Sequence, residues 1–105
     1  MKTLTAACAA LLLSAGSAPA EDLPDISTAD GLCDMVAMLA ETAMRGRQAS
    51  VPLGTMLEAV EDMPVGREIV LMAYERPRFN SPSVQQSETD DFRDQWHVEC
   101  LRAAE

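Results

Sequence analysis

The sequence predicts an all-α fold, a small antiparallel bundle of about four helices whose first and last members are joined by a disulfide. Apolar residues recur at helical spacing in several segments, and no segment alternates with the period of two typical of a half-buried strand. Beyond residue 20 the chain holds two cysteines, Cys33 near the start of the first amphipathic segment and Cys100 near the end of the last. Antiparallel helices with short loops bring these points together, so we expect a Cys33–Cys100 disulfide.

The first 20 residues have the layout of an export signal. Lys2 gives a positive start, 4–13 is a mostly apolar run, and the sequence Ala-Pro-Ala at 18–20 fits the small-residue cleavage rule. We expect cleavage after Ala20 and a periplasmic mature protein. No stretch reaches the roughly 18 consecutive apolar residues of a membrane-spanning helix, so we expect no membrane insertion.

The mature chain would have 105 − 20 = 85 residues, enough for one domain. We expect a flexible lead-in at 21–29 and a single helical domain at 30–105. All 17 acidic residues and seven arginines lie beyond residue 20, giving a mature net charge of 7 − 17 = −10. This charge repels nucleic acid, which we do not expect as a partner, and it favours encounter with cations or basic proteins.

The first helix is expected at about 32–47. Asp30 is the preferred N-cap residue and Thr28 the alternative. Arg45 and Arg47 fall in the last turn, where the helix dipole favours cations. A broad apolar face follows from helical spacing and comprises Leu32, Cys33, Val36, Ala37, Leu39, Ala40, Ala43 and Met44.

Two more helices are expected in the middle of the chain. The second should span about 52–62, after a start at Ser50 and Pro52, with Leu53, Met56, Leu57 and Val60 facing inward. Residues 63–66, Met-Pro-Val-Gly, should break the chain. The very apolar run at 69–73 could be a strand, but a lone strand would have no partner. We therefore expect it to be the central, most buried helix.

The final helix is predicted by local signals at both ends. Pro77 should stop the preceding helix, and Ser81 should cap a helix with Pro82 at its first position. This helix should run to Arg102 and carry one inward stripe at i, i+4 and i+8, formed by Phe92, Trp96 and Cys100.

No catalytic arrangement is visible in the sequence. His97 is the only histidine, and no Ser–His–Asp, Cys–His or phosphate-binding pattern is present. We therefore predict that the protein is not an enzyme and uses no cofactor.

Two residue groups could bind metal. Asp90 and Asp94 share a helix face, but they lack the loop pattern of EF-hand calcium sites, so a solvated acidic face is the preferred interpretation. Thioethers can hold Cu(I), although helical spacing places most of the methionines in the core. Exposure of one or two would instead favour an adaptable binding surface. The methionines are Met35, Met38, Met44, Met56, Met63 and Met72.

The segment 74–79 is the strongest candidate for protein binding. It places Tyr74, Arg76, Arg78 and Phe79 around a proline, and these residue types are enriched at binding hot spots. In the alternative interpretation the arginines pair with carboxylates of the chain and the aromatic side chains cover its core.

Several of these features together resemble small exported proteobacterial proteins with no assigned activity. They are a cysteine that opens an Ala- and Met-rich helix, Arg-Gln-Ala-Ser-Val-Pro at 47–52, Ala-Tyr-Glu-Arg-Pro-Arg at 73–78, and the Phe92, Trp96, Cys100 stripe. The resemblance implies a disulfide-closed helical domain in the periplasm and brings no catalytic residues. In size and layout the chain is also similar to periplasmic acid-stress chaperones and to helical immunity proteins against cell-wall amidases.

We therefore expect a non-enzymatic periplasmic protein that acts through protein contacts, as an acidic inhibitor or immunity-type binder of a basic envelope protein. The alternatives are a periplasmic stress chaperone and a metal-binding protein. The sequence indicates neither the identity of a partner nor an oligomeric state.

Overall fold

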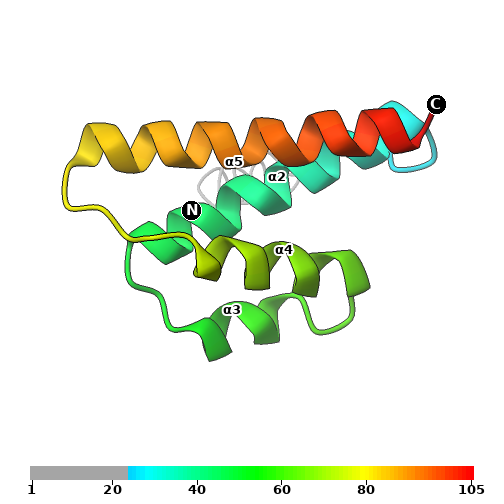
Figure 1. Cartoon of the computed structure of the whole chain (residues 1–105). Helices are drawn as coiled ribbons and strands as arrows, with labels where there is room; N and C mark the ends of the chain where they lie inside the picture. The colour runs from blue at the N-terminus through cyan, green and yellow to red at the C-terminus, as the bar shows by residue number, and fades with distance from the viewer. Residues whose placement is uncertain (1–23) are drawn as a thin grey trace, which may run out of the picture.

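Residues 24–105, which the computed structural model describes, form four α-helices and no strand. The predicted all-α class is therefore confirmed. The predicted export signal and the first residues of the lead-in lie outside the described residues. The helices are α2 (Ala29–Gln48), α3 (Leu53–Ala59), α4 (Pro64–Glu75) and α5 (Pro82–Ala103) (Figure 1).

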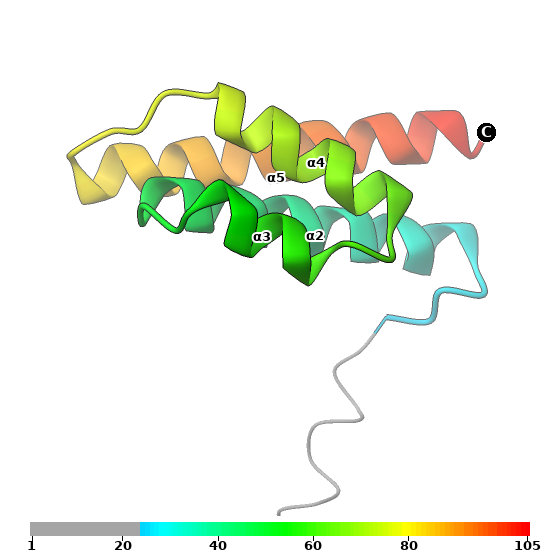
Figure 2. The ribbon, with the colours of Figure 1, turned by 90° about the horizontal axis from the view of Figure 1, so that it is seen from below.

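Helix α2 is the centre of the bundle, because it packs against each of the other three helices. Helix α5 runs antiparallel along it, while α4 and α3 cover another side (Figures 1 and 2). The expectation that the 69–73 helix would be central is wrong. Small residues on α2 allow close approach from several sides: a Cβ at Gly46 would lie 2.9 Å from the Met56 sulfur on α3.

The predicted disulfide is present and joins the first helix to the last. Cys33 and Cys100 are bonded, with a Cα–Cα distance of 5.5 Å and a sequence separation of 67. The bond fixes the start of α2 beside the end of α5, which Figure 1 shows as the meeting of cyan and red ends.

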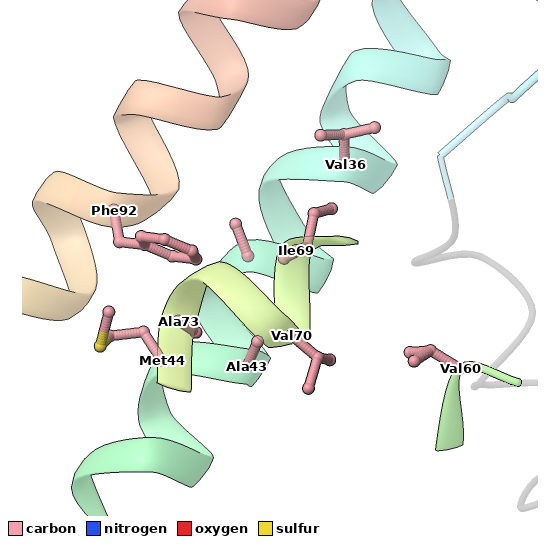
Figure 3. Packing of buried hydrophobic residues seen from close by; sticks show 9 residues of the cluster. Val36, Ala43, Met44, Val60, Ile69, Val70, Ala73 and Phe92 are labelled. Carbon is pink, nitrogen blue, oxygen red and sulfur yellow. The ribbon is translucent and has the colours of Figure 1, made fainter. Parts of the chain in front are cut away.

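The hydrophobic core lies where α2, α4 and α5 meet (Figure 3). Phe92 is fully buried, and its ring meets Trp96 edge-on with centroids 6.4 Å apart. Trp96 and Cys100 also pack against the core, which confirms the predicted stripe on α5. The buried cluster comprises Val36, Ala40, Ala43, Met44, Val60, Ile69, Val70, Ala73 and Phe92.

The first described helix begins earlier than predicted, and its N-cap residue is Thr28 rather than Asp30. The Thr28 hydroxyl accepts a hydrogen bond from the Gly31 N–H at 3.0 Å, while Asp30 lies in the first turn. A Cβ at Gly31 would overlap the Asp25 carbonyl oxygen. The chain before α2 therefore folds back against a position that only glycine fits.

The middle of the chain differs from the prediction at its junction. Helix α3 ends at Ala59 and α4 begins at Pro64, so the predicted break is present but lies at 60–63 rather than at 63–66. Proline suits the first helical position, where its missing N–H has no helical partner. Gly66 lies inside α4 and is buried against Val60, whose Cβ would be 2.9 Å from a Cβ at Gly66.

The junction between α4 and α5 follows the prediction. Helix α4 ends at Glu75, before Pro77, and α5 has Ser81 at its N-cap position with Pro82 next. The Ser81 hydroxyl lies 3.0 Å from the Ser83 hydroxyl and caps no helical N–H.

Candidate protein-binding surfaces

The predicted binding segment, 74–79, is held to the end of α2 by Gln48. Only 4% of Gln48 is exposed. Its side-chain amide donates to the Pro77 carbonyl at 3.0 Å and accepts from the Phe79 N–H at 2.9 Å. Its backbone carbonyl accepts from Arg78 Nε at 3.1 Å. One buried amide therefore fixes the path of this segment.

Tyr74 is tied to the loop that follows α2. Its hydroxyl donates to the Val51 carbonyl at 2.5 Å, and the Arg47 guanidinium carbon lies 5.6 Å from its ring centroid. Burial raises the pKa of Tyr74, and the positive charge of Arg47 opposes this rise. Arg47 also donates from Nε to the Arg76 carbonyl at 3.0 Å.

Arg76 contacts α5 rather than solvent alone. It donates to Gln95 Oε1 at 2.7 Å, lies 3.8 Å from the Glu88 carboxylate, and places its guanidinium carbon 5.3 Å from the Phe92 ring centroid. The four predicted residues therefore make contacts within the molecule, Arg76 with α5 and the other three with the end of α2 and the loop after it. The binding role of this segment stays a prediction, and the contacts match its structural alternative.

The two carboxylates considered as a metal site, Asp90 and Asp94 on α5, both contact Arg93. Arg93 lies 3.2 Å from Asp90 and 2.9 Å from Asp94. The pKa of Arg93 is raised, chiefly by its hydrogen bond to Asp94. His97 Nε2 lies 3.2 Å from Asp34 Oδ1 and so links α5 to α2. Within residues 24–105 no three histidine, cysteine or carboxylate side chains are placed to hold a metal ion.

The methionines divide between core and surface. Met44 is completely buried, whereas Met38 is 43% and Met63 is 39% exposed. Met35, Met56 and Met72 are half-buried. Gap-filling in the core therefore accounts for only part of the set.

An apolar groove lies between the first half of α2 and the junction of α3 with α4. Its volume is about 410 Å³. Leu32 and Val65 line it and are 49% and 44% exposed, although helical spacing predicted an inward position for Leu32. Asp62 supplies its only charged lining. The lining residues are Ile26, Leu32, Met35, Val36, Leu39, Asp62, Met63, Pro64 and Val65.

The two segments that line this apolar groove carry acidic side chains and no basic ones. The segments 24–39 and 60–65 supply every lining residue, and they contain five carboxylates and no lysine or arginine. The pKa of Asp25 is lowered by two hydrogen bonds from Ser27. The bond from the Ser27 hydroxyl has the larger effect and the bond from its backbone N–H the smaller. The five carboxylates, all exposed, are Asp25, Asp30, Asp34, Glu61 and Asp62.

Sequence reasoning missed both Gln48 and the groove. Gln48 gave no signal because it is a single polar residue late in the first helix, and the groove was missed because its lining comes from two segments far apart in the sequence. The exposed methionines were the only available hint of such a surface.

The geometry defines a small disulfide-closed helical bundle with an acidic, partly apolar surface. No protein family, curated protein or solved structure matches this chain. Within residues 24–105 no helix has the length and apolar character needed to cross a membrane.

Proposed function

We propose that this chain is a non-enzymatic, exported protein that acts by binding another protein, as an acidic inhibitor or immunity-type binder of a basic envelope protein. The observation that carries this proposal is the apolar groove, where large apolar side chains remain in contact with water among exposed carboxylates. Scattered exposed apolar residues are ordinary on protein surfaces. A contiguous apolar surface with a polar rim is typical of a protein-interaction site.

The charge of the chain supports a basic partner. Seventeen acidic side chains against eight lysines and arginines give the whole sequence a net charge of −9. Such a field steers a positively charged partner toward the surface and repels anionic ones. The apolar groove would then supply short-range affinity, while the carboxylates would supply speed and selectivity.

The proposal is tested by native mass spectrometry of the protein taken from the envelope of its own cells. We expect a 1:1 complex with a basic protein that dissociates between about 0.1 M and about 1 M salt, because the Debye length falls from about 10 Å to about 3 Å. Finding the protein free at low salt, with no salt-sensitive partner in the extract, would contradict the proposal.

A further inference from the structure

We infer that the apolar groove binds an amphipathic helical segment of the partner protein, with the segment's apolar face on the groove and its lysines or arginines beside the surrounding carboxylates. This inference rests on the proposed function and names the surface and the partner chemistry.

The volume and the lining of the groove suit the apolar side chains of a helix face. A volume of about 410 Å³, lined by eight apolar side chains and one carboxylate, can take several side chains from successive helical turns. Met35 and Met63 lie in this lining, and unbranched thioether side chains adapt to partners of different shape.

The carboxylates near the groove are available for a partner. Asp30, Glu61 and Asp62 form no ion pair or side-chain hydrogen bond with any other residue in 24–105. On α5, by contrast, Glu88 and Asp94 lie within ion-pair distance of arginines. Carboxylates without an ion pair also lie elsewhere among the described residues, for example Glu58, Glu68 and Asp91, but Asp30, Glu61 and Asp62 are the ones in the segments that line the apolar groove.

Charge also selects among the possible occupants. A second copy of this chain would bring five further carboxylates against the same five if the two grooves faced each other. A fatty acid or anionic lipid headgroup would meet the same repulsion. A helix with an apolar face and cationic flanks is the occupant that satisfies both the lining and its border.

Synthetic peptides test the inference directly. The first probe is an amphipathic peptide of about 18 residues, a helix of roughly 27 Å, with leucines on one face and lysines on its flanks. The second has glutamates in place of the lysines, and the third scrambles the first. Binding to the disulfide-bonded protein, prepared with and without residues 1–20, is measured by fluorescence anisotropy, and the contact surface is located by methyl NMR shifts.

We expect only the lysine-flanked peptide to bind, with shifts at Met35 and Met63 and at least about tenfold weaker binding at about 1 M than at about 0.1 M salt. Leu32→Gln and Val65→Ser should each weaken binding about tenfold or more. The matched controls are Val98→Ser and Leu101→Gln, exposed apolar positions on α5 outside the groove, which should leave binding unchanged.

Several results would overturn the inference. They are no binding of the lysine-flanked peptide, equal binding of the glutamate-flanked peptide, or shifts outside the groove. Sedimentation that shows a dimer lost in Leu32→Gln would assign the groove to a second copy. Groove shifts that depend on residues 1–20, without peptide, would assign it to the chain's own segment.

The test separates this inference from the proposed function. If the native 1:1 complex survives Leu32→Gln and Val65→Ser together, the protein binds its partner elsewhere and only the inference fails. If the wild-type protein captures no basic partner, the proposed function fails, whatever the peptides do.

Discussion

The two ends of helix α2 are held to the rest of the bundle by different interactions. At its C-terminal end, Gln48 and Arg47 hold the 74–79 segment through hydrogen bonds to backbone carbonyls and N–H groups. At its N-terminal end a disulfide ties α2 to α5, and the adjoining apolar groove stays open. Polar groups are therefore satisfied internally at one end, while apolar surface and charge remain available at the other. The comparison teaches that arginine and aromatic residues, which commonly mark binding sites, can also hold a segment in place through contacts within the chain, as Arg47 and Arg76 do here.

The largest expected effect is at the disulfide. Replacing Cys33 and Cys100 together by serine opens a loop of 67 residues. By chain entropy this should lower stability by about 4 kcal/mol, a drop in Tm of about 15–30 °C for a domain of this size. Thermal melting followed by circular dichroism measures the effect.

The wild-type protein melted under reducing conditions is the control, because it removes the crosslink without a substitution. Its Tm should agree with that of the double variant within a few degrees, on the order of 1 kcal/mol. If the double variant has the same Tm as the oxidised wild-type protein, the disulfide contributes no stability at the groove end of the bundle.

The next effect contrasts the two ends directly. Gln48→Leu should lower the free energy of unfolding by about 2–4 kcal/mol, because the Pro77 carbonyl and the Phe79 N–H both lose their side-chain partner. Leu32→Gln, in the open groove, should cost about 1 kcal/mol or less. Urea unfolding at constant m-value gives both numbers.

Gln86→Leu is the matched control for Gln48→Leu. Gln86 is an exposed glutamine on α5 whose side chain bonds only Asp90 among the described residues. Its replacement should change stability by no more than about 0.5 kcal/mol. If both variants lose the same free energy of unfolding, the buried Gln48 stabilises the protein no more than the exposed Gln86.

A smaller effect is expected in alkali, from Tyr74. Because its folded-state pKa is raised above the ordinary value of 10.0, folding favours the protonated phenol. This stability is complete below the unfolded-state pKa and is lost as pH rises through the folded-state pKa. Tyr74→Phe should cost about 1 kcal/mol at neutral pH and flatten the alkaline loss.

Tyr74 is the only tyrosine, so tyrosinate absorbance reports its titration without overlap. The native transition should lie above that of the urea-unfolded chain. Coincident transitions would show that burial of the phenol does not raise its pKa in the folded protein.

The smallest effect is expected at Asp25, beside the groove, and it has the opposite sign. Its folded-state pKa lies below 3.8, so any stability from this group is present above the unfolded-state pKa and is lost as pH falls through the folded-state pKa. Ser27→Ala removes the side-chain hydrogen bond of 2.6 Å and should raise the pKa of Asp25 toward 3.8. NMR titration of the carboxyl measures the shift, and an unchanged pKa would contradict the role of the hydroxyl.

Local rules predicted much of the fold. Helical spacing located the segments that became four helices, Pro77 and Ser81-Pro82 marked a real junction, and the positions of Cys33 and Cys100 predicted their bond. The helices and their junctions depend on residues that are near one another in sequence. The disulfide depends on the only two cysteines in the described range.

Long-range features were not predictable in the same way. The partners of Gln48 lie 29 to 31 residues away, and nothing local distinguishes this glutamine from a solvated one. Leu32 belongs to a genuine apolar stripe, but its exposure depends on how far the next helices cover it. The start of α4, with Pro64 and Val65, reaches this end of α2 but leaves Leu32 49% exposed.

The pairing of the first described helix with the last also governs the order of assembly. Chain that emerges from a membrane channel or a ribosome delivers α2 well before α5, so the α2 surface that faces α5 has no partner until nearly all of residues 24–105 are present. Cys33 and Cys100 are the only cysteines in this range, so an early oxidation of Cys33 can only capture a thiol outside it. The crosslink between α2 and α5 therefore cannot form until Cys100, near the end of the described chain, is available.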